Sequence, residues 1–471
     1  MTMVKVRIAP SPTGPLHLGN ARAALFNYVL ARKHNGVFIL RIEDTDVKRS
    51  EAVYEDDIKE ILNWLGLSWD EFYRESERTE IYQEHLKRLL KSGRIFWCSH
   101  TKDELAKEKE NQMLAKEAPR HMCSFRDGGG AGEKDISILR FKNDEKNTIE
   151  FNDLIRGLIS FRPELLGDFS VARSFDSPLM NFAVAVDDAL MGITHVIRGE
   201  DHISNTPKQI LLCRAFGFDK PEYAHLPLLL GKDRSKLSKR HGATAVSQYR
   251  KEGYLSEAMV NFLALLGWHD KDSQENDIFS LAELIKKFKL DNVQKGGAVF
   301  DIKKLDWING EYIRKKSVSD LSRDLAEFLK PEWQEEVKIN ADSWKKIVAL
   351  EQPRMAKLGD IGSNVVYFFE EPFIMKEELG WKNQSTAEIL GNLKKLNEIL
   401  FKIPEDQFNK NNIEKNITPL TAEVGTGEVL WPMRFSLSGK RASPGPFEIA
   451  DILGKEKTIV RITKAIELLA P

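Results

Sequence analysis

The segment 11–20 constrains the fold of this chain most strongly, because it joins an apolar run at residues 4–9 to an amphipathic helical pattern. A strand followed by a Pro/Gly-rich loop and a helix predicts an anion site, since the first N–H groups of a helix lack partners within it. Pro12 and Pro15 stiffen this loop, and Gly14 is expected to adopt backbone angles that other residues resist.

His17 and Gly19 stand at the start of that helix, whose apolar residues recur at helical spacing as far as Gly36. We expect His17 in the first turn, where its ring N–H can donate to a phosphate beside the positive helix end. An adenine or ribose ring against the backbone would explain Gly19, which is a poor helix former. The alternative is a loop histidine and a packing glycine, because short His-x-Gly patterns recur by accident.

Composition places the chain among globular proteins with more than one domain, since its 471 residues are 42% hydrophobic and 30% charged. Its apolar runs are too short to span a bilayer, and three cysteines give no disulfide framework. We therefore expect a cytoplasmic protein without a membrane partner. Lys plus Arg number 70 against 71 Asp plus Glu, so nucleic-acid binding would require local basic patches.

Glu43 follows residues 37–42, a nearly continuous apolar run that is typical of a parallel strand buried on both faces. In open α/β sheets the strand C-termini face the ligand crevice, so Glu43 would lie beside segment 11–20 and pair with a substrate ammonium. Alternatively, the carboxylates here cap the next helix, predicted over residues 51–66, a role that suits Asp44 or Asp46 better than Glu43.

Residues 89–177 are predicted to form an insertion, because buried-strand character returns only in segments 182–188 and 194–198, both candidate central strands. Two pairs within it, Cys98-x-His100 and His121-x-Cys123, offer the two thiolates and two imidazoles that suit tetrahedral zinc. Metal spacings usually leave two or more residues between paired ligands. Ordinary cysteines with surface histidines therefore remain the alternative.

After the insertion, Thr206 and Pro207 predict a helix start, with Cys213 packed on the buried side of that helix. A further apolar run at residues 226–230 precedes a stretch with six cationic or potentially cationic residues between 232 and 241. Mobile lysines beside a triphosphate site are what nucleotidyl chemistry requires, although charge runs are more often solvated surface.

Two motifs carry a family resemblance. His17-Leu18-Gly19-Asn20 resembles the first signature of class I aminoacyl-tRNA synthetases, and Lys236-Leu237-Ser238-Lys239-Arg240 resembles the second. Residues 7–14 look like the glutamyl version of the first motif, so the chain resembles the bacterial type of glutamyl-tRNA synthetase over essentially its whole length.

The resemblance implies an α/β class I Rossmann-like catalytic domain with an inserted α+β domain, followed by all-α domains. The implied boundaries are 1–88 and 178–242 for the catalytic halves, 89–177 for the acceptor-stem insertion, 243–312 for stem contact and 313–471 for anticodon binding. The implied reaction is two-step ligation of glutamate to tRNA-Glu, with ATP and Mg²⁺, by a monomer. An enzyme that also charges tRNA-Gln and a catalytically silent tRNA-binding paralogue remain alternatives.

The resemblance also implies site residues. Those for ATP are Pro10, Ser11, Pro12, Thr13, Gly14, His17, Gly19, Asn20 and Lys239, and the catalytic ones are His17, Lys236 and Lys239. Those for glutamate are Arg7, Ala9, Ser11, Glu43, Met180, Arg198 and His202. Arg7 is expected to pair bidentately with the substrate side-chain carboxylate. Met180 departs from the family pattern, which has a tyrosine there, and a thioether cannot donate a hydrogen bond.

Beyond residue 242 the pattern is helical, with nine Lys or Arg against four Asp or Glu between Lys286 and Lys316. This local basic patch is expected to contact a tRNA stem through phosphates, unless it is an ordinary solvated helix face. At Arg354 the family places an arginine that reads the third anticodon base. A phosphate or a neighbouring carboxylate is the alternative partner.

Overall fold

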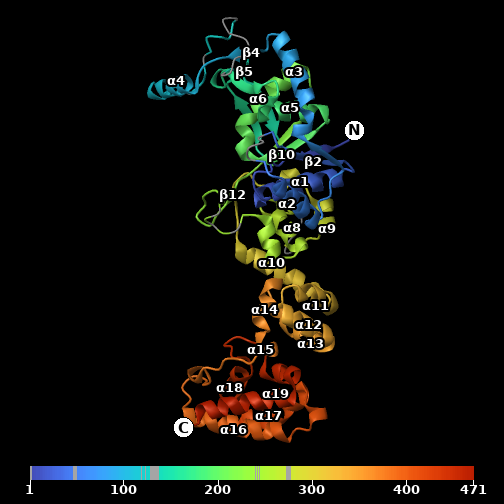
Figure 1. Ribbon diagram of the computed structural model, residues 1–471, viewed down its shortest axis with the longest axis vertical. Coiled ribbons are helices and arrows are strands. Elements are labelled where there is room, and N and C mark those ends of the chain that lie inside the picture. Colours follow the sequence, from blue (N-terminus) through green and yellow to red (C-terminus); the bar gives the residue numbers. More distant parts are fainter. Residues whose placement is uncertain are drawn as a thin grey trace. The chain divides into compact units, whose positions relative to one another are not determined.

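The computed structural model describes residues 3–45, 50–117, 119–121, 123–127, 137–238, 240, 242, 244–271 and 277–470. Lys239, an expected catalytic residue, lies outside these ranges. The chain divides into two compact units (Figure 1), residues 1–250 with 256–308 and residues 251–255 with 309–471.

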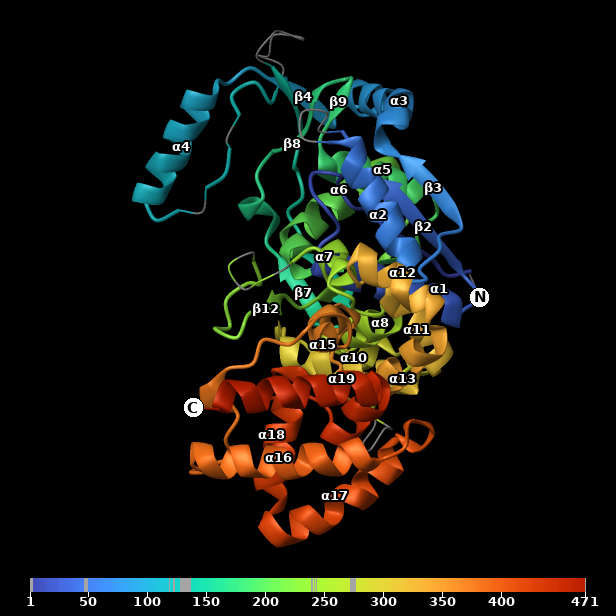
Figure 2. The ribbon, with the colours of Figure 1, turned by 60° about the horizontal axis from the view of Figure 1, so that its bottom comes forward.

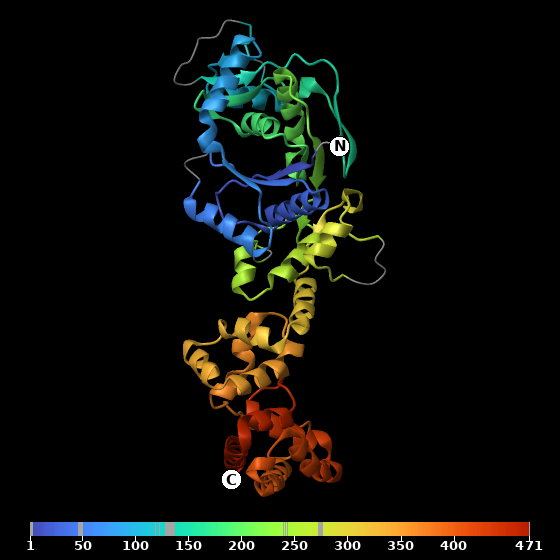
Figure 3. The same cartoon turned by 90° about the vertical axis from the view of Figure 1, so that its right-hand side faces the viewer.

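The first sheet of unit 1 is parallel, in the order β1 (Lys5–Ile8), β2 (Val37–Ile42) and β3 (Glu71–Arg74). Figure 3 shows α1 (Leu18–Lys33) beside these strands, with α2 (Ala52–Trp64) also drawn in blue. Phe38 to Leu40 of β2 are fully buried, as expected for a parallel strand covered on both faces. The predicted strand–loop–helix unit at the N-terminus is confirmed.

A second sheet has the order β10 (His195–Gly199), β11 (Glu222–Leu226), β6 (Ile149–Asp153) and β7 (Gly157–Phe161). The first three strands are parallel, and Arg198 lies opposite His225. The backbone N–H of Thr194 donates to the carbonyl oxygen of Lys5 over 2.8 Å, so β10 begins beside β1. Because β6 belongs to this sheet, the sheet continues across the domain boundary that we expect at residue 177.

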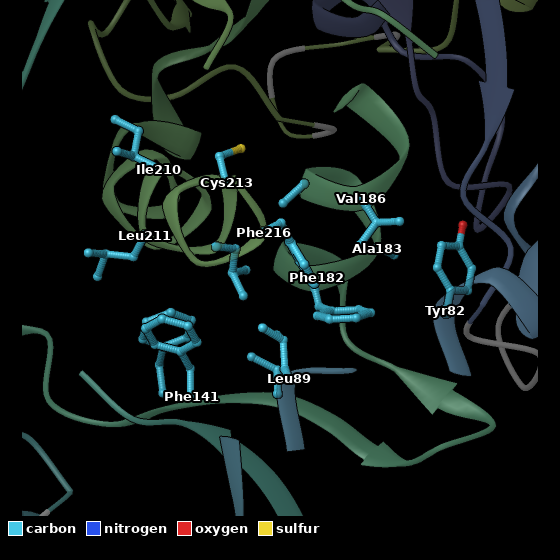
Figure 4. Packing of buried hydrophobic residues seen from close by; sticks show 14 of the residues in the cluster. Tyr82, Leu89, Phe141, Phe182, Ala183, Val186, Ile210, Leu211, Cys213 and Phe216 are labelled. Carbon is cyan, nitrogen blue, oxygen red and sulfur yellow. The ribbon is translucent and has the colours of Figure 1, made fainter. Parts of the chain in front are cut away.

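The prediction that residues 182–188 form a central strand is wrong. They belong to α5 (Met180–Leu190), which packs against α6 (Thr206–Phe216). An uninterrupted apolar run fits a buried helix as well as a buried strand, because both faces are covered in each case. Figure 4 shows Phe182 of α5 and Phe216 of α6 pointing into one core with Phe141 of the 89–177 segment.

The remaining strands of unit 1 form an antiparallel sheet and a short parallel pair. The sheet comprises β4 (Ile95–Cys98), β5 (Ile138–Phe141), β8 (Phe169–Ser174) and β9 (Ser177–Pro178), and the pair is β12 (Leu229–Leu230) with β13 (Ala298–Val299). The other helices before residue 316 are α3 (Thr79–Lys91), α4 (Lys102–Leu114), α7 (Val246–Lys251), α8 (Ser256–Leu265), α9 (Leu281–Lys287) and α10 (Ile302–Lys315), of which residues 309–315 belong to unit 2. In Figure 2, α4 stands clear of the rest of unit 1, consistent with its having no buried residue.

Unit 2 is helical, since the structure has only helices and turns between residues 309 and 470. Its helices are α11 (Val318–Ala326), α12 (Pro331–Ile339), α13 (Ala341–Glu351), α14 (Ile361–Asn364), α15 (Val366–Phe369), α16 (Thr386–Lys402), α17 (Lys410–Val424), α18 (Thr426–Ser438) and α19 (Pro446–Leu469). Helices α16 to α19 all contact one another (Figure 1). The predicted all-α C-terminal third is confirmed, and none of the described helices is long and apolar enough to cross a membrane.

Candidate active site

A cavity of about 650 Å³ in unit 1 gathers almost all of the residues expected at the site. The expected residues that line it are Arg7, Ala9, Pro10, Ser11, Thr13, Gly14, His17, Gly19, Asn20, Glu43, Met180, Arg198, His202 and Lys236. Pro12 is an exception. It is buried away from the cavity, and its carbonyl oxygen accepts the N–H of Glu51 over 3.0 Å.

His17 caps α1 and does not lie in its first turn. Its Nδ1 accepts the backbone N–H groups of Gly19 at 3.1 Å and Asn20 at 3.3 Å. The surrounding protein lowers the pKa of His17, and Lys236 lowers it further although Asp201 opposes the shift. The ring is therefore neutral near pH 7, and because Nδ1 is an acceptor, the proton sits on Nε2. Nε2–H remains a donor for a ligand in the cavity.

The backbone N–H groups at the start of α1 are not available to a phosphate, contrary to expectation. Leu18 donates to Thr244 O over 2.9 Å, Gly19 and Asn20 donate to the His17 ring, and Ala21 donates to His17 O over 3.0 Å. At this helix end, the His17 Nε2–H is therefore the donor that remains for a ligand.

The structure explains Gly14 of the loop and Gly19 of α1 differently from what the sequence led us to expect. A Cβ at Gly19 would lie 3.0 Å from Cε1 of His17, so the glycine makes room for the capping imidazole itself. Gly14 does not have a left-handed φ, and a Cβ there would meet nothing within 4 Å. No protein group therefore requires glycine at residue 14, although the residue lines the cavity.

The chain that follows the lysine-rich stretch is hydrogen-bonded to the same loop and helix start through its backbone. Besides the Leu18 to Thr244 bond, Val246 N–H donates to Leu16 O over 2.9 Å. Lys236 is largely exposed, with Nζ 3.9 Å from Asp201 Oδ2, and it lines the cavity. Residues of both motifs therefore line one cavity, although Arg240 of the second motif does not and donates to Asp233 and Ser235 instead.

Arg7 does not offer a free bidentate edge to a substrate. Its Nε and Nη2 donate to the two carboxylate oxygens of Asp188 at 3.1 and 3.3 Å. Arg41 Nη1 donates to the same carboxylate over 2.8 Å. Burial opposes ionisation of Asp188, yet Arg7 and Arg41 hold its pKa below the usual value. Sequence reasoning missed this pairing, and the Asp-Asp pair inside an apolar run was the only signal for it.

Glu43 follows β2 and reaches the cavity, as predicted. Its Oε1 lies 3.5 Å from Arg41 Nη2, and its backbone N–H donates to Pro10 O over 3.1 Å. Burial raises the pKa of Glu43, although Arg41 and Arg7 oppose the shift. The capping alternative does not hold for Glu43, because the N-cap of α2 is Glu51 and no side chain caps it.

Arg198 lies buried at the end of β10 and lines the cavity. Its Nε donates to His225 Nε2 over 3.3 Å, and its Nη2 donates to Thr206 Oγ1 and Gln209 Oε1, both over 2.9 Å. Among the described residues no carboxylate pairs with Arg198, and Nη1 has no hydrogen-bond partner. Burial, followed by the nearby Arg7, lowers the pKa of Arg198 to about 10.

His202 and Met180 complete the wall beside Arg198. Burial and then the neighbouring Arg198 lower the pKa of His202 to about 4, so this imidazole is neutral near pH 7. Met180 is the first residue of α5 and half-buried. A thioether at this position can pack against a ligand but cannot donate to one.

The four expected metal ligands form one cluster, with their ligand atoms within 4.8 Å of one another. Cys98 Sγ lies 3.4 Å from His100 Nδ1 and 3.5 Å from His121 Nε2, and Cys123 Sγ lies 3.6 Å from His100 Nδ1. In a tetrahedral zinc site the sulfur-to-nitrogen edge is about 3.6 Å, given the usual bond lengths. The residues present therefore fit zinc, and a carboxylate, Glu108, contacts His121 Nδ1 at 2.5 Å.

The basic stretch between residues 286 and 316 is less positive than its composition indicates. Within the described residues, at least four of its nine cations form ion pairs, which are Lys287–Asp270, Lys304–Asp277, Arg314–Glu311 and Lys316–Asp324. Three of these carboxylates lie outside the stretch, so composition alone could not reveal them. The structure therefore gives less support to a phosphate-binding patch here than the sequence does.

Arg354 lies in unit 2, at the end of a 3-10 turn (Gln352–Arg354). Its Nη1 is 3.6 Å from Oε1 of Glu351, a fully buried carboxylate. Burial raises the pKa of Glu351, with Arg354 opposing the shift. Burial lowers the pKa values of Arg434 and Lys440, and the charge of Arg354 lowers both further. Arg354 therefore does contact a neighbouring carboxylate, that of Glu351, which was the alternative to a base contact.

The arrangement defines the catalytic domain of a class I aminoacyl-tRNA synthetase. It comprises a parallel sheet, a helix capped by His17, and a lysine-rich segment whose continuation is hydrogen-bonded to the start of that helix. A family model described as "tRNA synthetases class I (E and Q), catalytic domain" matches residues 3–307, and one described as "Anticodon binding domain" matches residues 323–466. The family and the fold class predicted from the sequence are thereby confirmed.

Relatives narrow the class. The chain is 43% identical to a glutamate–tRNA ligase of Aquifex aeolicus, with all of both chains covered, and 42% identical to one of Carboxydothermus hydrogenoformans, with 98% and 99% covered. It is similar to the crystal structure of a glutamate tRNA ligase from Elizabethkingia meningosepticum, with a TM-score of 0.86, 33% identity and 99% and 100% coverage. The chain belongs to the glutamate–tRNA ligase family.

Proposed function

We propose that this protein ligates glutamate to tRNA-Glu in two steps. Glutamate attacks the α-phosphate of ATP to give glutamyl-adenylate and pyrophosphate, and the terminal ribose of the tRNA then takes the acyl group and releases AMP. Arg198 carries the proposal. Burying a guanidinium without a counter-ion costs several kcal/mol, so a carboxylate ligand that enters the cavity is strongly favoured.

Each described side chain receives a role from its charge and contacts. Arg198 Nη1 binds the side-chain carboxylate of glutamate, and Glu43, whose charge is only partly compensated, binds the ammonium. Arg7 keeps only Nη1 for a ligand, so its part is chiefly to hold Asp188 in place. Glutamine would leave Arg198 without a counter-charge, which gives a physical basis for its rejection.

Phosphate chemistry falls to His17 and the lysines. His17 Nε2–H donates to a phosphate oxygen, and Lys236 with Lys239 offsets the charge that develops as pyrophosphate leaves. ATP enters with Mg²⁺, which neutralises part of the phosphate charge. No covalent protein intermediate is needed, because positioning and electrostatics suffice for attack on phosphorus.

We assign tRNA contacts to the segments 89–177, 243–312 and 313–471, for the acceptor end, the stem and the anticodon. The helical character of residues 309–470 supports the last of these. Within residues 313–471, Arg354 reads the third anticodon base. The protein acts as a monomer. The Cys98, His100, His121 and Cys123 cluster holds zinc in a structural role, since all four ligand positions are filled by protein.

ATP–pyrophosphate exchange with glutamate, run with and without tRNA, tests the function. Exchange that requires glutamate, followed by transfer to tRNA-Glu, is the expected result. Exchange without any transfer to tRNA would indicate an adenylating enzyme of another kind. Binding of tRNA without exchange would indicate a silent paralogue.

A further inference from the structure

A buried carboxylate–imidazole pair lies directly behind Arg198. Asp153, at the end of β6, and His225, on β11, are both fully buried. Asp153 Oδ2 and His225 Nδ1 are 2.6 Å apart, and His225 Nε2 lies 3.3 Å from Nε of Arg198. Neither Asp153 nor His225 lines the cavity.

The pair fixes the tautomer of the imidazole. Asp153 also accepts the backbone N–H groups of Ile155 at 3.0 Å, Arg156 at 2.9 Å and His225 at 3.1 Å. Burial opposes its ionisation, but the His225 ring and these N–H groups hold the pKa of Asp153 below its usual value. A carboxylate can only accept, so the ring proton lies on Nδ1, and Nε2 presents a lone pair to Arg198 Nε and to the Thr206 hydroxyl, which lies 3.2 Å away.

We propose that Asp153 and His225 are positioning residues for glutamate recognition, because together they give Arg198 a neutral acceptor that aims its free Nη1 into the cavity. This inference rests on the proposed function and extends it to two residues that touch no substrate. Arg198 thereby keeps an uncancelled charge for the substrate carboxylate.

Arg7 provides an internal comparison for this device. Its guanidinium meets the carboxylate of Asp188 directly, so its charge is already paired. Arg198 instead meets three neutral acceptors, His225, Thr206 and Gln209. The imidazole thus orients Arg198 as a carboxylate would, but it holds the negative charge of Asp153 one ring further away.

Gln209 is aligned in the same way. Its Nε2 donates to Asn181 Oδ1 over 3.2 Å, so its Oε1 is the atom turned toward Arg198. Asn181 follows Met180, the residue that departs from the family pattern. The orientation of Arg198 is therefore set from β11, α6 and α5 together.

Asp153→Asn tests the tautomer directly. One oxygen becomes an NH₂ group, and if the remaining oxygen stays on the Ile155 and Arg156 N–H groups, the NH₂ donates to His225 Nδ1. The ring proton then moves to Nε2 and opposes the Arg198 N–H. In tRNA-dependent ATP–pyrophosphate exchange, we expect the KM for glutamate to rise roughly ten- to a hundredfold, the range for a lost hydrogen bond to a charged group. The KM for ATP and the KM for glutamine should stay within about twofold, so discrimination between the amino acids narrows.

His225 variants give a second, independent test. His225→Leu removes the acceptor and should raise the KM for glutamate in the same way. His225→Gln places an amide oxygen close to the position that Nε2 occupies and should return the KM for glutamate toward its normal value. His195→Leu is the matched control, because His195 is a half-buried histidine of the neighbouring strand β10 whose ring bonds Thr194. It should leave the KM for glutamate unchanged.

The outcomes separate this inference from the proposed function. If the unmodified protein shows no glutamate-dependent exchange, the function itself fails. If the unmodified protein does show glutamate-dependent exchange, two results would overturn the positioning role. One is equal changes in the KM values for glutamate and ATP. The other is a KM for glutamate in His225→Gln that stays as high as in His225→Leu. If Asp153→Asn does not fold, the His225 series decides alone.

Discussion

The backbone N–H of Leu18 donates to the carbonyl oxygen of Thr244 over 2.9 Å, which bonds the start of α1 to the chain leaving the lysine-rich segment. Val246 and Leu16 form a second bond of the same kind beside it. A displacement of the segment that carries Lys236 would therefore strain or break the hydrogen bonds at the start of the helix that His17 caps. In the proposed reaction both motifs act on the same phosphates, and this backbone link keeps them in register.

His17 combines two roles that substitution can separate. His17→Ala removes both the N-cap and the Nε2–H donor, so we expect glutamate activation to slow at least about a hundredfold. The variant should also lose about 1 kcal/mol of stability, the usual cost of a lost cap. His17→Asn keeps a capping oxygen but lacks the ring donor. The melting temperature of His17→Asn should be close to that of the unmodified protein, while its activation of glutamate should be about as slow as that of His17→Ala. A near-normal activation rate would show that only the cap matters.

Gly19→Ala places a methyl group 3.0 Å from the His17 ring. We expect little net change in stability, because the gain of about 1 kcal/mol from alanine in a helix is offset by the weakened His17 cap. Activation should nevertheless fall by about tenfold or more, as the ring is pushed from its cap position. Thermal melting and exchange kinetics measure the two effects.

Gly14→Ala is the matched control, since a Cβ there meets no protein atom within 4 Å. Melting should not change, so any loss of activity at residue 14 reports a ligand that approaches the backbone. If Gly19→Ala retains full activity, the tight fit between residue 19 and the imidazole is not needed for function.

Local patterns predicted much of this fold. The loop between β1 and α1, the start of α6 at Thr206 and the helices of unit 2 were predicted because turn residues, caps and periodicity act over a few residues. The start of α1 was misjudged by one position, which changed the role of the helix N–H groups. Cap positions depend on side-chain geometry that residue types alone do not specify.

What the sequence could not provide are pairings between distant segments. Arg7 and Asp188 lie on separate elements, and the Asp-Asp pair inside an apolar run indicates a buried charge without indicating which cation it meets. The same holds for Asp153, His225 and Arg198, which come from three strands of one sheet. The helix α5 was missed because its buried residues show no periodicity, and hydrophobic burial alone does not distinguish a helix from a strand.

Zinc content can be measured directly. Protein purified without chelator should contain about one equivalent of zinc, and Cys98→Ser or Cys123→Ser should lose it, since each removes a thiolate ligand. Cys213→Ser is the control, because this buried cysteine lies in α6 and outside the cluster. It should retain the metal. Less than about a tenth of an equivalent in the unmodified protein would exclude zinc.

Arg354→Gln should narrow the preference for tRNA-Glu over tRNA-Gln by about 1 to 3 kcal/mol, the usual value of one base-edge contact. It should also lower stability, because buried Glu351 loses its nearest cation. Arg354→Lys keeps the charge without the planar fork, so it should recover stability but not discrimination. Charging assays with both tRNAs and thermal melting distinguish these effects, and equal loss on both tRNAs would instead indicate a phosphate contact.

The most direct measurement is the ratio of kcat/KM for glutamate to that for glutamine, in tRNA-dependent ATP–pyrophosphate exchange, for the unmodified protein and Arg198→Gln. Because removing one partner of a buried ion pair costs about 3 to 5 kcal/mol, the ratio should fall at least about a hundredfold in the variant, mainly through glutamate. A folded Arg198→Gln protein with an unchanged ratio, or an unmodified protein that activates both amino acids equally, would contradict the role of Arg198 in selecting glutamate.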